Sequence, residues 1–380
     1  MGLHDLSDLS YPWDSIAGIA ATARAHPGGL VDLSMGTPVD PTPEVVRHAL
    51  EAASDAPGYP MTAGTPALRQ AVADWFARRR GVPGLDPAAV VPTIGSKELV
   101  GLLPSLLHLG PGDVVVHPAV AYPTYVAGIR AAGATPLGCD DVADWAGRDD
   151  VRMVWVNSPG NPTGRVLDVE ALRAVVEAAR AIGAVVVSDE CYAELAWEAP
   201  WVADPGAGPG HGGVPSVLDP RVCGGSHEGL LAAYSLSKQS SIAGYRAAFL
   251  AGDAAVIAEL TQIRKHLGLI VPAPVQAAMT AALSDDEHVA AQRATYGARR
   301  RALAAALAAA GLTVDESGAG LYLWVAARDG RSGQQLAEWF AERGILTAPG
   351  HLYGDDKHTR VALTATDAQI ADAVSRLTEA

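Results

Sequence analysis

The 380-residue sequence has few cysteines, few charged side chains and no excess of basic ones. Cys139, Cys191 and Cys223 are an odd, widely spaced set without a CxxC pair, which argues against a disulfide framework or a metal site and favours a reducing cytoplasm. Charged residues make up only 18%, and 28 basic against 42 acidic side chains give a net charge of −14. This balance disfavours nucleic acid and anionic membranes as partners. The HExxH and GxSxG motifs of metal and serine hydrolases are also absent.

The N-terminal residues 1–13 contain acidic side chains and no apolar core segment. They predict neither a signal peptide nor a membrane anchor. A chain of this length, with 49% hydrophobic residues, exceeds what one hydrophobic core usually serves, so we expect two domains. We assign an N-terminal arm and part of a small domain to residues 1–40, a large domain to 41–283 and a C-terminal small domain to 284–380. The arm is expected to be extended and to end in a strand at 30–34.

From residue 88 onward, short apolar, β-branched segments alternate with helical ones. The expected strands are 88–93, 113–117, 135–138, 151–156, 184–188, 230–234 and 247–251, and the expected helices between them are 97–109, 122–132 and 168–182. This order predicts an α/β fold with a mostly parallel central sheet and helices on both faces. A long helix at 285–310 leads to a smaller α+β unit. Ligands of such sheets bind at the carboxyl ends of the strands.

Proline marks the start of one helix, and proline with glycine marks one long loop. Thr65 as N-cap and Pro66 at the first helical position predict a helix that ends at Arg80. The arginines at 78–80 lie in its last turn, where they are expected to complement the helix dipole. Residues 200–229 are rich in glycine and proline and neither follow a strand nor open a helix, so we expect a mobile surface loop rather than a dinucleotide fingerprint.

A lysine stands directly after the expected strand at 230–234. Ser235 and Ser237 precede Lys238, and Arg246 follows it. A lysine on a crowded strand end near other cations can lose its proton and attack carbonyls, as in Schiff-base chemistry with pyridoxal phosphate (PLP). Taken alone, such a short motif is more often a surface lysine in a polar loop.

Two further turns carry polar or aromatic residues between a strand and a helix. Ser96 and Lys97 stand where free backbone N–H groups and the helix dipole favour a phosphate, although Ser96 is equally expected as a simple cap. Tyr122 opens the next helix, either as a core residue or as an aromatic face on which a flat ring stacks. Both turns lie at the edge where ligands are expected.

The next two strand ends carry an amide and a carboxylate. Residues 157–164, Asn-Ser-Pro-Gly-Asn-Pro-Thr-Gly, form a proline-rich rigid turn that can aim the amide of Asn161 into a site, and either X-Pro bond can be cis. Asp189 ends an apolar strand, where a carboxylate is costly to bury without a cationic partner such as a protonated pyridine nitrogen. The alternative is a helix cap by Asp189.

Together, these stretches resemble the fold-type I PLP enzymes, specifically the class I/II aminotransferases, from about Trp13 to Leu377. The resemblance implies that Lys238 holds PLP as a Schiff base and moves a proton between the substrate and the cofactor. It implies that the carboxylate of Asp189 keeps the pyridine nitrogen protonated. Asn161 and Tyr192 match the pair that binds the phenolic oxygen of PLP.

The same resemblance extends to the phosphate, the substrate and a second subunit. The residues that match the phosphate cup are Ser96, Lys97, Ser235, Ser237 and Arg246. Tyr122 matches the ring that stacks on the cofactor, and Tyr59 matches a tyrosine that reaches the phosphate of the neighbouring subunit. Tyr59 therefore implies a homodimer with shared active sites. Gly36 resembles a glycine that lines the substrate pocket, and Arg360 the arginine that clamps the substrate α-carboxylate.

Within the family, the sequence is most similar to the actinobacterial-type N-succinyldiaminopimelate aminotransferases. The stretches that carry this similarity are Tyr11-Pro12-Trp13-Asp14 and residues 32–40, 94–99, 188–192, 271–276 and 360–366. The implied reaction converts N-succinyl-2-amino-6-oxopimelate and glutamate to N-succinyl-LL-2,6-diaminopimelate and 2-oxoglutarate, a step in lysine and diaminopimelate biosynthesis.

Other functions within the same fold stay open at this point. Aspartate or another amino acid could be the substrate, and a PLP lyase or synthase would use the same cofactor motifs. A PLP-binding transcription regulator is disfavoured by the acidic charge and because only a short acidic arm precedes the first expected strand. No motif marks the group that binds the distal carboxylate of the substrates; Arg24, Arg264, Lys265 and His266 are candidates.

Overall fold

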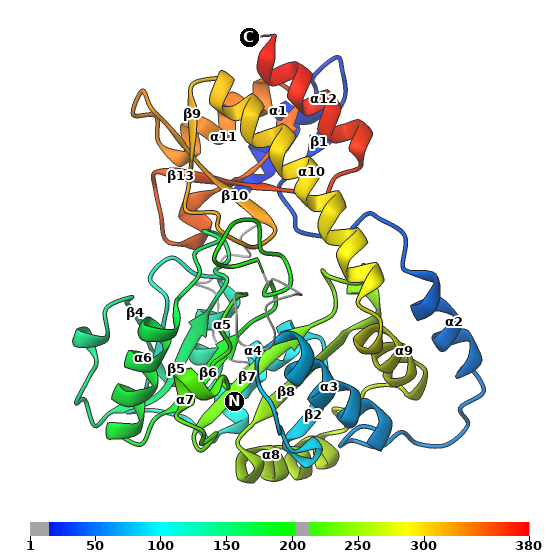
Figure 1. The fold of residues 1–380 in the computed structure, drawn as a ribbon. Helices are drawn as coiled ribbons and strands as arrows, with labels where there is room; N and C mark the ends of the chain where they lie inside the picture. Colours follow the sequence, from blue (N-terminus) through cyan, green and yellow to red (C-terminus); the bar gives the residue numbers. More distant parts are fainter. Residues whose placement is uncertain (1–14, 203–212, 380) are drawn as a thin grey trace, which may run out of the picture.

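The computed structural model describes residues 15–202 and 213–379, and all statements below refer to these. The stretch Tyr11-Pro12-Trp13-Asp14 and the glycine-rich residues 206–212 lie outside them. The described chain forms a seven-stranded sheet and a four-stranded sheet, hereafter the main sheet and the small sheet (Figure 1). None of its helices is both long and apolar enough to cross a membrane.

The main sheet confirms the predicted, mostly parallel α/β architecture. Its strand order is β2 (Val90–Ile94), β8 (Ala247–Gly252), β7 (Leu230–Ser235), β6 (Val185–Asp189), β5 (Val151–Asn157), β3 (Val114–His117) and β4 (Thr135–Gly138). Only β8 runs antiparallel to its neighbours, β2 and β7. Strands β7 and β8 are buried along their whole length, as expected for strands covered on both faces.

Helices cover both faces of the main sheet. One face packs against α4 (Ser96–Leu106), α5 (Thr124–Ala131) and α8 (Ala254–Leu267). The other face packs against α2 (Glu44–Ala52), α3 (Pro66–Arg79), α6 (Val169–Ala181), α7 (Pro220–Cys223) and α9 (Ala273–Ser284). Single 3-10 turns occupy Pro87–Ala89, Val142–Asp144, Ala243–Tyr245 and Gly350–Tyr353. The two apolar cores hold the parallel strands so that their carboxyl ends meet at one edge.

The small sheet lies beyond that edge (Figure 1) and is antiparallel, in the order β12 (Ala348–Pro349), β13 (His358–Ala362), β10 (Tyr322–Ala327) and β9 (Leu312–Asp315). The long helix α10 (Glu287–Ala309) runs between the two sheets, and α11 (Gly333–Glu342) and α12 (Asp367–Thr378) complete this part. β1 (Val31–Asp32) pairs in parallel with β11 (Ile345–Leu346).

The prediction of an extended N-terminal arm is wrong for its described part. Residues Ala17–Arg24 form helix α1, whose Ile19, Ala20 and Ala23 are buried in a small core with Ala337 of α11. The N-cap of helix α1 is Ile16, whose side chain cannot accept a hydrogen bond from the first helical amides.

The N-cap at Thr65 is confirmed, and the arginines that end α3 do more than complement its dipole. The Thr65 hydroxyl accepts a hydrogen bond from the amide of Leu68 at 3.1 Å. The three arginines each pair with a different carboxylate: Arg78 with Asp286, Arg79 with Glu194 and Arg80 with Glu190. The last two acids flank Tyr192 in the segment that follows β6, so α3 ties down the edge of the main sheet.

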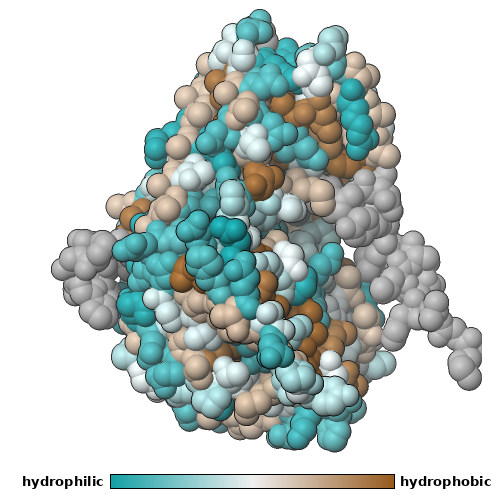
Figure 2. All heavy atoms as spheres, turned by 90° about the vertical axis from the view of Figure 1, so that its right-hand side faces the viewer, coloured by the Kyte–Doolittle hydropathy of each residue, from teal (hydrophilic) through white to brown (hydrophobic). Residues whose placement is uncertain are grey.

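Large hydrophobic side chains remain exposed on one side of the molecule. Tyr59 is 102% exposed, Met61 51% and Val39 46%, and all three lie in the stretch around α2. Figure 2 views the protein from this side and shows hydrophobic residues among hydrophilic ones on its surface. Such side chains are candidates for an interface with another protein chain.

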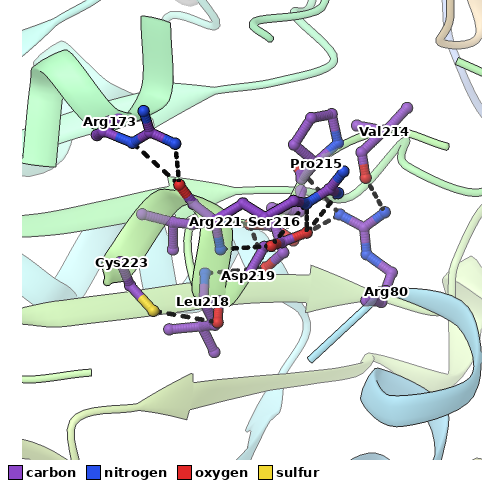
Figure 3. A network of polar contacts seen from close by, with 11 residues as sticks. Arg80, Arg173, Val214, Pro215, Ser216, Leu218, Asp219, Arg221 and Cys223 are labelled. Carbon is purple, nitrogen blue, oxygen red and sulfur yellow. Dashed lines mark hydrogen bonds and ion pairs between the residues drawn. The ribbon is translucent and has the colours of Figure 1, made fainter. Parts of the chain in front are cut away.

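The prediction of a surface loop at 200–229 is wrong for the residues just before α7. Residues 214–219 are buried, and α7 follows them directly. In Figure 3, the guanidinium of Arg80 donates to the carbonyl oxygens of Val214 at 2.8 Å and Pro215 at 3.4 Å, and Arg173 donates to that of Arg221 at 2.6 Å. Arginines from α3 and α6 therefore hold this glycine- and proline-rich stretch against the main sheet.

Candidate active site

A cavity of about 300 Å³ opens at the carboxyl ends of β5, β6 and β7, between the main sheet and the small sheet. Twelve of the thirteen predicted site residues line it: Gly36, Ser96, Lys97, Tyr122, Asn161, Asp189, Tyr192, Ser235, Ser237, Lys238, Arg246 and Arg360. Residues as far apart in the sequence as Gly36 and Arg360 thus meet in one place. The thirteenth, Tyr59, is fully exposed and does not line the cavity.

Lys238 follows β7 and reaches into the cavity. Its Nζ donates a hydrogen bond to the carbonyl oxygen of Gly36. Burial lowers the pKa of Lys238 below its ordinary value, and the positive charges of Arg360 and Arg246 act in the same direction. An amine with a lowered pKa is neutral in more of the molecules at a given pH, and only the neutral amine is a nucleophile.

Asp189 ends β6, the strand that pairs with β7, and lines the same cavity. Its Oδ2 accepts a hydrogen bond from the hydroxyl of Tyr125 at 2.9 Å, and its Oδ1 accepts one from the amide of Cys191 at 3.2 Å. Burial raises the pKa of Asp189, although these donors oppose the shift. A cation placed against this carboxylate would keep it ionised.

Sequence reasoning missed Tyr125. It lies in the first turn of α5, three residues after Tyr122, is completely buried, and packs against Trp155 with ring centroids 5.0 Å apart. The available signal was the Tyr-Pro-Thr-Tyr spacing at the start of α5, where the two rings lie with centroids 6.1 Å apart.

Arg360 lies on β13 and reaches the cavity from the small sheet. Its Nη1 donates to Oδ1 of Asn161 at 2.9 Å, and its Nη2 donates to the carbonyl oxygen of Ser34 at 2.6 Å. The backbone amide of Asn161 donates in turn to Oδ1 of Asn157 at 2.8 Å. The Ser158-Pro159 and Asn161-Pro162 bonds are both cis. The hydrogen bonds to Asn157 and Arg360 hold the side-chain amide of Asn161 against the guanidinium.

A cradle for an anion forms at the amino end of α4. Gly95 caps this helix with φ of 78°, a conformation that favours glycine, and a Cβ at this position would lie 2.1 Å from Nη2 of Arg246, so the guanidinium stands directly beside the cap. The hydroxyl of Ser235 donates to that of Ser237 at 2.9 Å beside the same cavity. Hydroxyls, a guanidinium and a helix N-terminus together suit a phosphate group.

Arg264, one of the suggested ligands for the distal carboxylate, has a different partner. It is buried and pairs with Glu98 of α4 at 2.9 Å, while Glu98 also accepts from the amide of Ile94. This ion pair fixes the start of α4. Arg24, Lys265 and His266 do not line the cavity either, so the proposal of these four residues is not supported.

The charge of the cavity is opposite to that of the whole chain. Among the described residues that line it, four are basic, namely Lys97, Lys238, Arg246 and Arg360, and one is acidic, Asp189. The chain as a whole carries a net charge of −14. A local excess of cations attracts anionic ligands despite an acidic surface.

Comparison with known proteins identifies the family. The model of aminotransferase class I and II matches residues 29–377. This chain belongs to that family. A probable aminotransferase of Mycobacterium tuberculosis is 54% identical to this aminotransferase over 370 residues, which cover 97% of this chain and 85% of that protein. The 4-dedimethylamino-4-oxo-anhydrotetracycline transaminase OxyQ of Streptomyces rimosus is 51% identical over 370 residues, 97% of this chain and 98% of that one.

A solved structure agrees with the fold. A probable N-succinyldiaminopimelate aminotransferase from Thermus thermophilus superimposes on this aminotransferase with a TM-score of 0.83 at 28% identity, and the match covers 97% of this chain and 99% of that one. The fold-type I architecture expected from the sequence is confirmed, as is the assignment as an aminotransferase.

The enzyme is PLP-dependent, as its family is, and the cavity fits this cofactor. The cradle formed by Gly95, Ser96 and Arg246 suits the phosphate, and the buried carboxylate of Asp189 suits the pyridine nitrogen. Bound PLP supplies a conjugated ring that takes up the electrons of the substrate Cα–H bond. Within the same cavity, Lys238 offers the amine that family members use to hold this cofactor.

Proposed function

We propose that the enzyme transfers the amino group of glutamate to N-succinyl-2-amino-6-oxopimelate, yielding 2-oxoglutarate and N-succinyl-LL-2,6-diaminopimelate in lysine and diaminopimelate biosynthesis. The observation that carries the proposal is the shared cavity of Lys238 and Arg360, in which cations outnumber carboxylates. Both substrates are amino or keto acids with further carboxylates, which suits such a cavity. The solved structure named as a probable N-succinyldiaminopimelate aminotransferase supports the same substrate.

The proposal gives each side chain a task. The guanidinium of Arg360 binds the substrate α-carboxylate as a fork, with the amide of Asn161 beside it, and so orients the Cα–H bond. Nζ of Lys238 takes the Cα proton and later returns a proton to the product. Asp189 stabilises a protonated pyridine nitrogen, and the hydroxyl of Tyr192 binds the phenolic oxygen of the cofactor.

The remaining predicted residues hold the cofactor in place. The phosphate is bound by Ser96, Lys97, Ser235, Ser237 and Arg246, with the amino end of α4. Tyr122 lines the cavity from α5's side and stacks on the ring. Gly36 leaves room for the substrate, since its backbone lines the cavity.

The proposal includes a homodimer, in which Tyr59 completes the site of the partner. Its complete exposure supports this role, because a side chain that serves another subunit has no cover within its own chain. The hydrophobic side chains on the face in Figure 2 support an interface there.

We further propose the domain limits 41–283 and 284–380, with residues 1–40 contributing to the small domain. We also propose a cytoplasmic location, which fits the three free cysteines.

A second candidate substrate follows from the tetracycline relative. A transaminase named for 4-dedimethylamino-4-oxo-anhydrotetracycline is 51% identical to this chain over almost its entire length. An amino donor would bind the same lysine and arginine, while the ketone would be a large polycyclic molecule. A PLP lyase or regulator would use the cofactor residues without an amino acceptor.

The test is the absorbance of the bound cofactor during two half-reactions. Purified holoenzyme is titrated with glutamate, and the spectrum is expected to convert to that of the aminated cofactor. The product is then mixed separately with N-succinyl-2-amino-6-oxopimelate, oxaloacetate and the tetracycline ketone. Recovery of the starting spectrum fastest with the succinylated keto acid supports the proposal.

If the starting spectrum returns only with oxaloacetate or only with the tetracycline ketone, that compound is the amino acceptor in place of the succinylated keto acid. The enzyme would still be an aminotransferase. A spectrum that glutamate leaves unchanged would reject glutamate as the donor. The Lys238→Ala variant serves as the control: it lacks the amine, so glutamate should not convert its spectrum to that of the aminated cofactor.

A further inference from the structure

Tyr322 is a buried aromatic residue of the cavity that no sequence motif marks. It begins β10 and pairs with Ala362 on β13, two residues after Arg360. The side chain is 4% exposed, lines the cavity and contacts residues from both sheets. None of the roles proposed above uses it.

The ring of Tyr322 lies against the arginine. Cζ of Arg360 is 4.0 Å from the centroid of the Tyr322 ring and 4.8 Å from that of Tyr353. Together with the carbonyl of Ser34 and the amide oxygen of Asn161, these rings orient the guanidinium. All four contacts come from neutral groups, so they position the cation without cancelling its charge.

The hydroxyl of Tyr322 lies against the opposite side of the site. It is 3.3 Å from the hydroxyl of Tyr192. A Cβ at Gly36 would lie 2.1 Å from it, so this hydroxyl explains why position 36 carries glycine. The carbonyl of the same Gly36 accepts the hydrogen bond from Nζ of Lys238. The phenol thus contacts the arginine with its ring and the surroundings of the lysine with its hydroxyl.

We propose that Tyr322 is a positioning residue of the transamination site: its ring holds Arg360 for the substrate carboxylate, and its hydroxyl couples that arginine to Tyr192 and Lys238. The inference rests on the proposed role of Arg360 as the carboxylate clamp. Tyr322 would then connect Arg360 of the small sheet, which binds the substrate carboxylate, with Nζ of Lys238, which follows a strand of the main sheet.

The charged groups around the phenol of Tyr322 determine how substrate binding changes its pKa. Tyr322 faces Arg360 of β13, Lys238 after β7, Tyr192 after β6 and the backbone of Gly36. Arg360 and Lys238 hold the pKa of Tyr322 below its ordinary value against the effect of burial. A carboxylate bound to Arg360 offsets one of these cations, so the pKa values of the phenol and of the neighbouring lysine rise together.

The test uses glutarate, a dicarboxylate without an amino group, as the probe. Its dissociation constant and the pH midpoint of the cofactor absorbance, with and without glutarate, are measured on the holoenzymes of wild type, Tyr322→Phe, Tyr322→Leu and Tyr353→Phe. Tyr353→Phe is the matched control, because it removes a buried hydroxyl from the other ring at the same guanidinium. Circular dichroism and cofactor content verify that each variant is folded.

Tyr322→Phe keeps the ring, so it is expected to bind glutarate within about threefold of wild type while the glutarate-induced shift of the midpoint falls to about half or less. Tyr322→Leu loses the ring contact and is expected to bind glutarate about tenfold more weakly. Tyr353→Phe should change neither quantity. A wild-type midpoint shift in Tyr322→Phe would overturn the coupling, even if Tyr322→Leu fails to fold.

Arg360→Gln separates this inference from the function on which it rests. If Arg360→Gln binds glutarate as well as wild type does, the clamp itself is wrong. If Arg360→Gln loses glutarate while both Tyr322 variants behave as wild type, only the role of Tyr322 is wrong.

Discussion

Arg80 and Glu190 form an ion pair that is almost completely enclosed, with Nη2 of Arg80 2.7 Å from Oε2 of Glu190 and side chains 2% and 1% exposed. Glu190 directly follows Asp189, and its other oxygen accepts hydrogen bonds from the hydroxyl of Ser216 and the amide of Val217. One buried carboxylate therefore joins α3, the end of β6 and the segment before α7. The ion pair therefore holds in place the end of β6, where Asp189 lines the cavity.

Removing one partner of this pair is expected to destabilise the protein strongly. Arg80→Met leaves Glu190 buried without its cation, which should lower the free energy of unfolding by about 3–5 kcal/mol. Urea unfolding followed by circular dichroism measures the change. The matched control is Arg78→Met, because the Arg78–Asp286 pair lies two residues away with side chains 41% and 39% exposed. Its loss should lower the free energy of unfolding by about 1 kcal/mol or less. Equal effects of the two substitutions would contradict the argument.

Tyr125→Phe is expected to destabilise the ionised form of the Asp189 carboxyl group. The substitution keeps the ring and removes the hydroxyl that donates to Oδ2 of Asp189 at 2.9 Å. A hydrogen bond to a charged group contributes about 1.5–3 kcal/mol, so kcat should fall at least about tenfold and the pKa of Asp189 should rise further. The acid limb of the pH–rate profile should then move to higher pH, because the carboxylate protonates earlier as the pH falls.

The control for Tyr125→Phe is Tyr234→Phe. Tyr234 is equally buried, but its hydroxyl donates to Oε1 of Gln239, on the other face of the main sheet. This variant should lose stability without moving the pH profile. An unchanged profile in Tyr125→Phe would mean that the phenol does not support the carboxylate.

The sequence contains enough information for the main sheet and most of the cavity. The expected strands at 230–234 and 247–251 and the expected helix at 168–182 match β7, β8 and α6 to within one residue at each end, because short apolar runs and capped amphipathic segments are local signals. Because the carboxyl ends of parallel strands meet, the sequence also predicts that Ser96, Tyr122, Asn161, Asp189 and Lys238 lie at one edge, and all five line the cavity. Lys238 and Arg360 could be paired only through the family resemblance, since nothing local in the sequence joins them.

What the sequence could not show depends on distant partners. The stretch 214–219 looks like a loop from its composition, yet it is buried because Arg80 and Glu190 provide the hydrogen bonds that its backbone needs. Tyr322 enters the cavity through the pairing of β10 with β13, a register that no spacing in the sequence reveals. Arg264 was a candidate for binding the distal carboxylate of the substrate, but it pairs instead with Glu98, which is far from it in the sequence.

Lys238→Met is expected to stop turnover and to stabilise the cofactor-free protein at neutral pH. The pKa of Lys238 is lower in the folded protein than in the unfolded chain, so the unfolded chain binds more protons between the two values and wild-type stability rises with pH there. Below both values the folded protein carries the full penalty of a desolvated cation. The stability advantage of Lys238→Met should therefore be largest near pH 7 and shrink as the pH approaches the unfolded value of about 10.4.

Urea midpoints of the cofactor-free wild type and of Lys238→Met at pH 7 and pH 10 measure this difference. A cofactor-free wild type that is more stable than Lys238→Met at pH 7 would show that the amine is not desolvated as described. Measurable transamination by Lys238→Met would remove Lys238 from its proposed role.

The proposed role of the exposed Tyr59 in the site of a partner chain can be tested by substituting it. If its hydroxyl binds the phosphate in the partner's site, Tyr59→Ala should weaken cofactor retention by about 10- to 100-fold, as expected for the loss of a hydrogen bond to a charged group. Tyr59→Ala and Lys238→Ala homodimers should then both be inactive under cofactor-limited conditions. Tyr59→Phe, which keeps the ring, should show the effect of the hydroxyl alone.

Mixing the two inactive proteins separates a role in the partner's site from a role in the same chain. In a hybrid dimer, the chain with Lys238 receives an intact Tyr59 from the Lys238→Ala chain, which restores one site of the two. Random exchange at equal concentrations makes about half of the dimers hybrid, so about one quarter of wild-type activity should return. If Tyr59 served its own chain, each hybrid site would lack one of the two residues and no activity would return. The activity of the mixture after subunit exchange therefore decides between a shared and a self-contained active site.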